Sequence, residues 1–205
     1  ENVLFKISFP AEFHSQTAVE AAVTLHQQLQ AAGKSVADIQ KITIRTHEAC
    51  IRIIDKQGPL NNEADRDHCI QYMVAVPLIF GTLKASDYEA GVAADPRIDT
   101  LRAKIHCVED PQYTADYHDP EKRSIANALT VTFNDGSTLA EVAVEYPIGH
   151  RRRRADGIPL LEAKFRTNLA RRFPQKQQDA ILAVSLDQHI LEAMPVHDYI
   201  DLYVI

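Results

Sequence analysis

Apolar residues near the start of the chain recur with the spacing of a helix that buries one face. They fall three or four positions apart, at Val19, Ala22, Val23, His26 and Leu29. This periodicity predicts an amphipathic helix. Ser15 or Thr17 can cap its N-terminus, and the helix is expected to end near Gly33. His26 lies on the apolar face and is expected to be a hydrogen-bonded core histidine.

Three later segments alternate apolar and polar residues, as strands with one solvated face do. They are residues 39–46, 126–133 and 138–146. The last two are joined by Asn-Asp-Gly-Ser at 134–137, which is a strong hairpin signal. The pattern therefore predicts an antiparallel sheet of three or more strands.

The segments between these strands favour helices and loops. Residues 64–80 predict a helix with a kink at Pro77, and residues 95–104 predict a short helix with Pro96 at its first position. Residues 110–122 are polar, carry two prolines, and predict a long surface loop. Helices packed on an antiparallel sheet define the α+β class.

The C-terminal part predicts two further helices. The first opens at Pro159 and stops at Pro174, with an apolar stripe of Leu161, Phe165, Leu169 and Phe173. The second covers residues 175–191. Apolar stripes at four-residue spacing require a packing partner.

Composition and charge exclude several classes. The chain has 205 residues, 45% of them hydrophobic, which is enough for one substantial core. Its 28 acidic and 22 basic residues give a net charge of -6, which argues against a nucleic-acid partner. No apolar run approaches the ~18 residues of a membrane span, and no leader pattern is visible. The sequence predicts a soluble, cytoplasmic protein without a membrane partner.

The three cysteines do not suggest a cofactor. Cys50, Cys69 and Cys107 are widely spaced, so core thiols are favoured over a disulfide framework or a zinc site. An iron–sulfur cluster is a weaker alternative, because such clusters usually use closely paired cysteines.

The opening stretch is the first candidate site. Pro10 favours an extended or turned backbone over residues 6–13. Lys6 and His14 therefore precede the N-terminus of the first helix, where backbone N–H groups and the helix dipole favour an anion.

Several motifs then support a resemblance that covers essentially all 205 residues. They are Phe5-Lys6, Phe9-Pro10-Ala11 before a Val-Glu-Ala-Ala helix, Gln71-Tyr72, Asn134-Asp135-Gly136, and Tyr146 to His150 before Lys164-Phe165. In this order they resemble the second domain of the MmgE/PrpD family. The resemblance implies a metal-independent hydro-lyase, with no cofactor, that removes water from the small tricarboxylate 2-methylcitrate during propionate catabolism.

The resemblance also implies a domain organisation. Residues 1–157 would form an α+β, lid-like domain, and residues 158–205 a helical segment. That segment would pack on an all-helical N-terminal domain of the same polypeptide, which these 205 residues do not include. The chain alone is therefore expected to be inactive or nearly so, because half a cleft does not orient a substrate.

Dehydration requires a base, an acid and cations for the carboxylates. Lys6 matches the family's lysine before the Phe-Pro turn, in the cleft between the domains, and is expected to be catalytic. His14 is also expected to be catalytic, although many members place this histidine where the present chain has Gln16. The alternative to a catalytic role is that Lys6 is a solvent-exposed surface lysine that takes no part in the site.

Five other residues are expected to bind substrate. Arg66, His68 and Tyr72 would lie at the start of the second helix, with His68 and Tyr72 on one face. A core tyrosine is the alternative for Tyr72. His150 belongs to a Gly-His pair that approaches the domain junction in the family, and Arg151 follows this pair. The basic run that Arg151 begins lacks the interleaved aromatic residues of a nucleic-acid surface.

Two alternative functions remain open. A related enzyme could decarboxylate cis-aconitate in the same kind of anion-binding cleft. A non-catalytic module could instead form a homodimer through the apolar stripe of residues 161–173.

Overall fold

The computed structural model describes residues 6–205, so Phe5, one of the residues that carry the resemblance, lies outside the described part. The chain divides into two compact units, one ending at Arg154 and the other covering Ala155–Ile205. The functional division after residue 157 stays a prediction.

A four-stranded sheet forms one layer of the first unit. Its order is β2 (Ile105–Glu109), β1 (Ile39–Thr46), β3 (Asn127–Phe133) and β4 (Val142–Val144). β1 and β3 are antiparallel, as are β3 and β4, whereas β2 joins the other edge of β1 in parallel. The α+β class and the hairpin are confirmed. The parallel strand β2 was not predicted, because its five residues do not alternate clearly.

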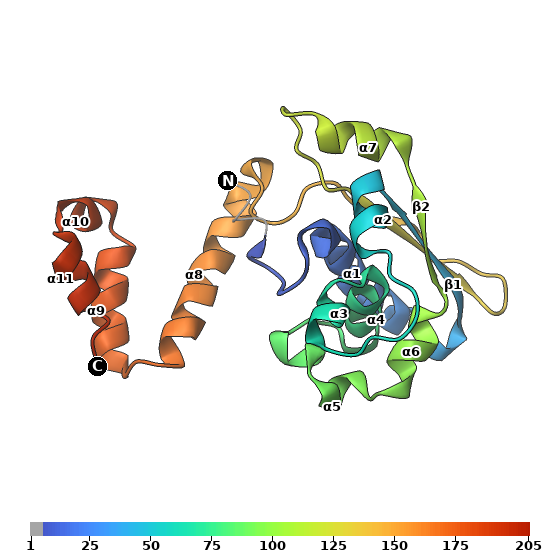
Figure 1. The fold of residues 1–205 in the computed structure, drawn as a ribbon, viewed down its shortest axis with the longest axis horizontal. Coiled ribbons are helices and arrows are strands. Elements are labelled where there is room, and N and C mark those ends of the chain that lie inside the picture. The colour runs from blue at the N-terminus through green and yellow to red at the C-terminus, as the bar shows by residue number, and fades with distance from the viewer. Residues whose placement is uncertain (1–5) are drawn as a thin grey trace. The chain divides into compact units, whose positions relative to one another are not determined.

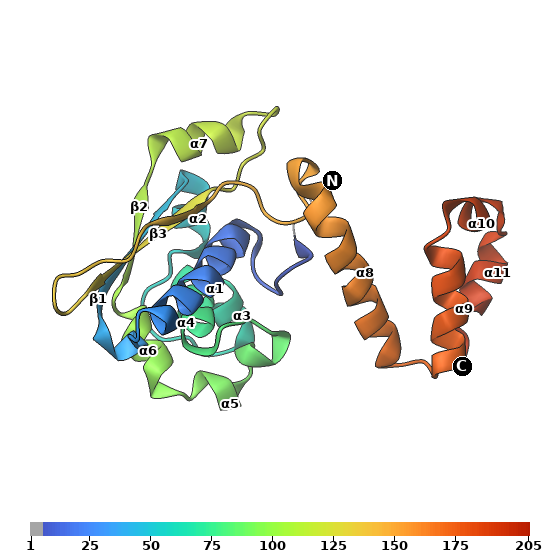
Figure 2. The same cartoon turned by 180° about the vertical axis from the view of Figure 1, so that it is seen from behind.

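Helices pack on one face of this sheet and, in the case of α7, beyond its end (Figure 1). They are α1 (Gln16–Ala31), α2 (Glu48–Ile54), α3 (Glu63–Asp67), α4 (Ile70–Phe80), α5 (Ala90–Ala93), α6 (Pro96–Arg102) and α7 (Pro111–His118). In Figures 1 and 2, α1 and α4 lie side by side against the sheet, and α7 lies beyond the end of β2. Leu25 of α1 and Met73 of α4 are fully buried with Ile42 and Val131 of the sheet. This burial of apolar surface stabilises the unit.

The predicted cap of α1 is only partly confirmed. Ser15 occupies the N-cap position, but its side chain makes no capping hydrogen bond. Its hydroxyl instead donates to the Glu12 carbonyl at 2.7 Å. His26 makes the expected hydrogen bond, with Nδ1 2.9 Å from the Leu78 carbonyl oxygen.

The helix predicted over residues 64–80 is wrong at one point, because it breaks into α3 and α4. Cys69 has extended dihedral angles, φ -128° and ψ 105°, between the two helices. Its thiol lies 3.3 Å from the Lys56 carbonyl oxygen, outside both helices. His68 and Tyr72 therefore do not share a helix face, and the expectation that they do is wrong.

The surface loop predicted over residues 110–122 is also wrong, because most of it is α7. Asp110 is the N-cap, and its carboxylate accepts the backbone N–H of Gln112 at 2.9 Å. Pro111 occupies the first helical position, where a missing N–H is harmless. Of the two prolines that suggested a loop, Pro111 therefore starts a helix and Pro120 follows its end.

The second unit consists of helices α8 (Arg154–Ala170), α9 (Gln175–Ser185), α10 (Gln188–Ala193) and α11 (Val196–Asp201). Its small core contains Leu169, Ile181 and Leu182, with Phe165 and Phe173 packed against them. The predicted stripe therefore contributes to this core.

The boundaries of the second unit differ from the predicted ones. α8 begins before Pro159, which lies inside it, and the helix predicted over residues 175–191 breaks where Asp187 caps α10. α11 was not predicted. Val196 and Ile200 of α11 are exposed. Within residues 6–205, no helix combines the length and apolar character needed to cross a membrane.

Candidate functional site

The opening segment folds into a turn that ends in a short 3₁₀ helix, Phe13–Ser15, directly before α1. The turned backbone expected for residues 6–13 is thus confirmed, whereas His14 lies in the 3₁₀ helix. Glu12 caps this helix, since its Oε2 accepts the His14 backbone N–H at 2.7 Å. The same carboxylate contacts the His14 ring, with 2.9 Å between Oε1 and Nδ1.

His14 is buried, at 7% exposure, and has a partner at each ring nitrogen. Its Nε2 lies 3.2 Å from the hydroxyl of Tyr117 on α7. Burial alone would raise the pKa of the Glu12 carboxyl, but the hydrogen bonds and charge of His14 together hold this pKa below its usual value. Glu12 is therefore a carboxylate near neutral pH.

His47, the N-cap residue of α2, completes the aromatic side of the site. Its ring stacks on Tyr117, with 4.6 Å between centroids and 17° between planes, and its centroid is 5.3 Å from that of His14. Burial, together with the charge of His14, lowers the pKa of His47 to about 4. His47 is therefore neutral at neutral pH, and its Nε2 has no hydrogen-bond partner within the described residues.

Charged groups lie at the outer side of this cluster. Lys6 is exposed, and its charge acts on Asp67, whose carboxylate also interacts with Glu12. Burial raises the pKa of Asp67. His68 is exposed, 3.6 Å from Asp67 between Nδ1 and Oδ2, and its charge acts on Glu12. The structure therefore brings three predicted residues, Lys6, His14 and His68, into one neighbourhood.

A pocket of about 260 Å³ opens beside Tyr117. Its lining comes from the opening turn, the end of α7 and the segment that follows α7: Phe13, Tyr117, His118, Asp119, Pro120, Arg123, Ser124 and Ile125. The pocket thus combines an apolar wall with hydroxyl, imidazole and guanidinium groups and the carboxylate of Asp119. A small polar molecule fits this combination.

A buried asparagine fixes the opening turn to the sheet. The side-chain amide of Asn127, on β3, donates to the His14 carbonyl at 2.9 Å and to the Thr17 hydroxyl at 2.8 Å. Thr17 in turn donates to the Ile125 carbonyl at 2.5 Å. The backbone of His14 is therefore held by residues more than a hundred positions away.

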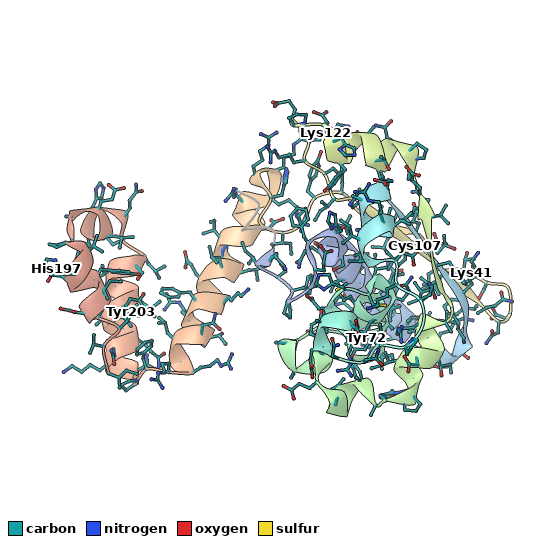
Figure 3. All side chains as sticks on the ribbon, viewed as in Figure 1. Lys41, Tyr72, Cys107, Lys122, His197 and Tyr203 are labelled. Carbon is teal, nitrogen blue, oxygen red and sulfur yellow. The ribbon has the colours of Figure 1, made fainter. Side chains whose placement is uncertain are left out.

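Two other predicted residues lie within the helical layer, away from this cluster. Arg66 is buried and donates to the Tyr88 carbonyl at 2.6 Å. Tyr72 is buried among the helices (Figure 3), and its hydroxyl donates to the Asp87 carbonyl at 2.5 Å. Burial raises its pKa to about 12. Both side chains serve the packing of α3 and α4, and their role in substrate binding stays a prediction.

His150 and Arg151 contact the segment that follows α7. His150 is buried, with Nε2 3.0 Å from the carbonyl oxygen of Lys122, a residue labelled in Figure 3. Arg151 donates to the Glu121 carbonyl. Because Arg123 of the pocket follows directly in the chain, His150 and Arg151 hold the backbone next to a residue of the pocket lining. Direct contact with a substrate stays a prediction for both.

The sequence analysis missed Glu12, His47 and Tyr117 as site residues. Tyr117 was placed in a loop, and the sequence analysis assigned no element to the segment around His47. The Asp110-Pro111 pair was the signal for α7, because these residues are typical of an N-cap and the first helical position. That helix places Tyr117 beside His14.

The cysteines do not form a metal site within the part of the chain that the structure describes. Cys50 and Cys69 are buried, Cys107 is partly buried, and all three are free thiols. Burial raises the pKa of Cys50 to about 12. Among residues 6–205, no three His, Cys, Asp or Glu side chains are placed to hold a metal ion.

Comparison with known proteins identifies the class. The MmgE/PrpD C-terminal domain matches residues 9–188, which is most of the chain, so the chain belongs to the MmgE/PrpD family.

Individual relatives are more specific. The chain is 74% identical to 2-methylcitrate dehydratase of Salmonella typhimurium and 73% identical to that of Escherichia coli strain K12, over 205 residues. It is 58% identical over 204 residues to the mitochondrial 2-methylcitrate dehydratase of Yarrowia lipolytica. Each alignment covers 100% of this chain, but only 42% of the two bacterial relatives and 39% of the yeast one. The chain therefore spans about two fifths of their length.

Proposed function

We propose that the whole polypeptide carrying this chain is a hydro-lyase that dehydrates 2-methylcitrate to 2-methyl-cis-aconitate in propionate catabolism. The observation that carries the proposal is the 74% identity, along all 205 residues, to a protein named 2-methylcitrate dehydratase. The chain would supply one side of the active site. An N-terminal helical domain of the same polypeptide would supply the other.

The chemistry of the opening segment supports this role. Dehydration requires a proton to be taken from carbon and another to be given to the leaving hydroxyl. Lys6 and His14 can exchange protons, and exposed Lys6 and His68 can attract the carboxylates of a tricarboxylate. The mechanism uses no metal or cofactor in this proposal. Arg66, Tyr72, His150 and Arg151 remain predicted contributors to substrate binding.

Location and assembly belong to the same proposal. A cytoplasmic location suits a bacterial enzyme of this kind, although the yeast relative is named as mitochondrial. A homodimer, and residues 158–205 as the segment that packs on the N-terminal domain, also stay proposals. No nucleic-acid or membrane partner is proposed.

The test follows the ultraviolet absorbance of the conjugated alkene product after 2-methylcitrate is added to the full-length polypeptide. Lys6→Ala should reduce the rate by about 100-fold, the scale expected for loss of a proton-transfer or carboxylate-binding group. Lys41→Ala, at an exposed position of β1, is the control and should leave the rate unchanged. An unchanged rate in Lys6→Ala would move the chemistry to the rest of the polypeptide.

Two further outcomes discriminate against the alternatives. Release of carbon dioxide from cis-aconitate, without dehydration of 2-methylcitrate, would identify a decarboxylase instead. The 205-residue chain alone should show no measurable turnover, because half of a cleft does not orient the substrate. Full turnover by this chain would refute the two-sided site.

A further inference from the structure

Glu12, His14 and Tyr117 form a continuous chain of polar contacts. The Glu12 carboxylate lies 2.9 Å from Nδ1 of His14, and Nε2 of His14 lies 3.2 Å from the Tyr117 hydroxyl. A carboxylate only accepts hydrogen bonds, so Nδ1 carries a proton and Nε2 is left to exchange one with Tyr117. This is the arrangement by which a carboxylate orients an imidazole for proton transfer.

The electrostatic surroundings determine the charges of Glu12, Tyr117 and His47. Glu12 is ionised near neutral pH, and an ionised carboxylate stabilises a protonated His14. Burial and the charge of Glu12 raise the pKa of Tyr117, so the phenol keeps its proton. His47, stacked on Tyr117, is neutral and adds no competing charge. The cluster therefore places a carboxylate-oriented imidazole next to the protonated hydroxyl of Tyr117.

Tyr117 connects this cluster to the pocket. Its side chain is partly exposed and lines the pocket, whereas His14 is not among the lining residues. On the pocket wall, Arg123 is exposed and makes no ion pair within residues 6–205. Its backbone has φ 49°, a left-handed conformation that a residue with a side chain rarely adopts. Arg123 and Tyr117 therefore line the same pocket.

We propose that Tyr117 is a catalytic residue that protonates the leaving hydroxyl of the substrate, with His14 as its proton supply and Arg123 as a contact for a substrate carboxylate. This inference rests on the proposed function and deepens it. The C–O bond breaks with its electron pair, and the departing oxygen takes the Tyr117 proton and leaves as water. A separate base takes the proton from the neighbouring carbon, and the C=C bond forms. The Tyr117 phenolate then takes the proton on Nε2 of His14, which is restored from solvent.

The experiment uses the full-length polypeptide and 2-methylcitrate. Tyr117→Phe keeps the ring stacked on His47 and removes only the hydroxyl. It should lower kcat by about 100-fold and change KM by less than about threefold, since general acid catalysis contributes on that scale to kcat. Arg123→Gln should mainly raise KM. Tyr113→Phe, on the same helix but outside the pocket lining, is the matched control and should behave as wild type.

A second measurement separates proton transfer from folding. His14→Asn should lower kcat as Tyr117→Phe does, and the double variant should lose no more than either single variant, because both lie on one proton path. Calorimetric binding of the unreactive tricarboxylate tricarballylate should persist in Tyr117→Phe, which shows that the pocket is intact.

The outcomes distinguish the two proposals. An active wild type with an equally active Tyr117→Phe variant overturns the role of Tyr117 and leaves the proposed function in place. Additive losses in the double variant overturn the shared path. A wild type without dehydratase activity on 2-methylcitrate overturns the proposed function itself.

Discussion

Tyr117 lies flat against His47, with 4.6 Å between the ring centroids. One ring comes from α7 and the other from the residue that precedes α2, so the stack joins two helices at the end of the sheet. The contact also removes His47 from water, and its relative exposure is 0%. This burial gives the fold a specific response to acid.

His47 should make the chain less stable as the pH falls. Its pKa is about 4 in the folded chain, below the usual 6.5, because burial and the charge of His14 disfavour the imidazolium, as does His118, whereas Glu12 favours it. Between these values the unfolded chain binds more protons, so stability is full above pH 6.5 and falls towards pH 4. The total loss should be about 3 kcal/mol.

Urea unfolding at a series of pH values measures this effect. His47→Gln should flatten the dependence between pH 6.5 and 4, whereas His106→Gln, at an exposed position of β2, should preserve it. An unchanged pH dependence in His47→Gln would show that another group is responsible.

Asn127→Ala should destabilise the chain by about 2–3 kcal/mol, because it leaves the buried Thr17 hydroxyl and His14 carbonyl without their amide partner. The matched control is Asn168→Ala, at an exposed position of α8, which should change stability by less than about 0.5 kcal/mol. Urea unfolding monitored by circular dichroism compares the two variants. Equal effects would mean that the Asn127 contacts contribute little.

Gly81→Ala should also be destabilising, by about 1–2 kcal/mol. Gly81 ends α4 with φ 78°, and an added Cβ would lie 3.0 Å from the His26 ring. Gly91→Ala, in α5, meets nothing within 4 Å and should be neutral or slightly stabilising. Melting temperatures of both variants provide the comparison. A neutral Gly81→Ala variant would contradict the assigned strain.

Arg153→Lys tests whether a bidentate ion pair stabilises the segment that follows β4. The two terminal nitrogens of the Arg153 guanidinium each lie 2.9 Å from one carboxylate oxygen of Glu20 on α1, and Nη1 also donates to the Tyr146 carbonyl. Lysine cannot form this bidentate contact, so the free energy of unfolding should fall by about 1 kcal/mol. Arg52→Lys, in a mostly exposed pair with Glu48, is the control and should have almost no effect. The free energy of unfolding in urea is measured for both variants, and equal losses would refute the prediction.

The sequence predicted the elements whose patterns are local. The alternation of residues 39–46 and the Asn-Asp-Gly turn gave β1 and the hairpin, because both depend on side-chain periodicity and turn chemistry. Two features depended on contacts between distant segments. β2 forms because β1 has a free edge, and the break before α4 coincides with the contact between Cys69 and Lys56. Periodicity carries no information on such contacts.

The candidate site was predicted only in part, because some of its residues come together only through contacts between distant segments. Lys6 and His14 were recognised from a turn next to a helix, which is a local signal. Tyr117 and His47 become site residues only because the fold brings α7 and the start of α2 next to His14. Arg66 and Tyr72 had suitable side chains, but the helical layer uses their polar atoms for hydrogen bonds to backbone carbonyls.

The central position of β1 affects how the protein is made. Ile44 of β1 pairs with Cys107 on one side and with Leu129 on the other, and both partners follow much later in the chain. During synthesis from the N-terminus, β1 therefore leaves the ribosome with two unpaired edges. Long-range pairing of this kind is slow, and unpaired strand edges aggregate readily. The order of synthesis thus leaves the edges of β1 unprotected until its partner strands have emerged.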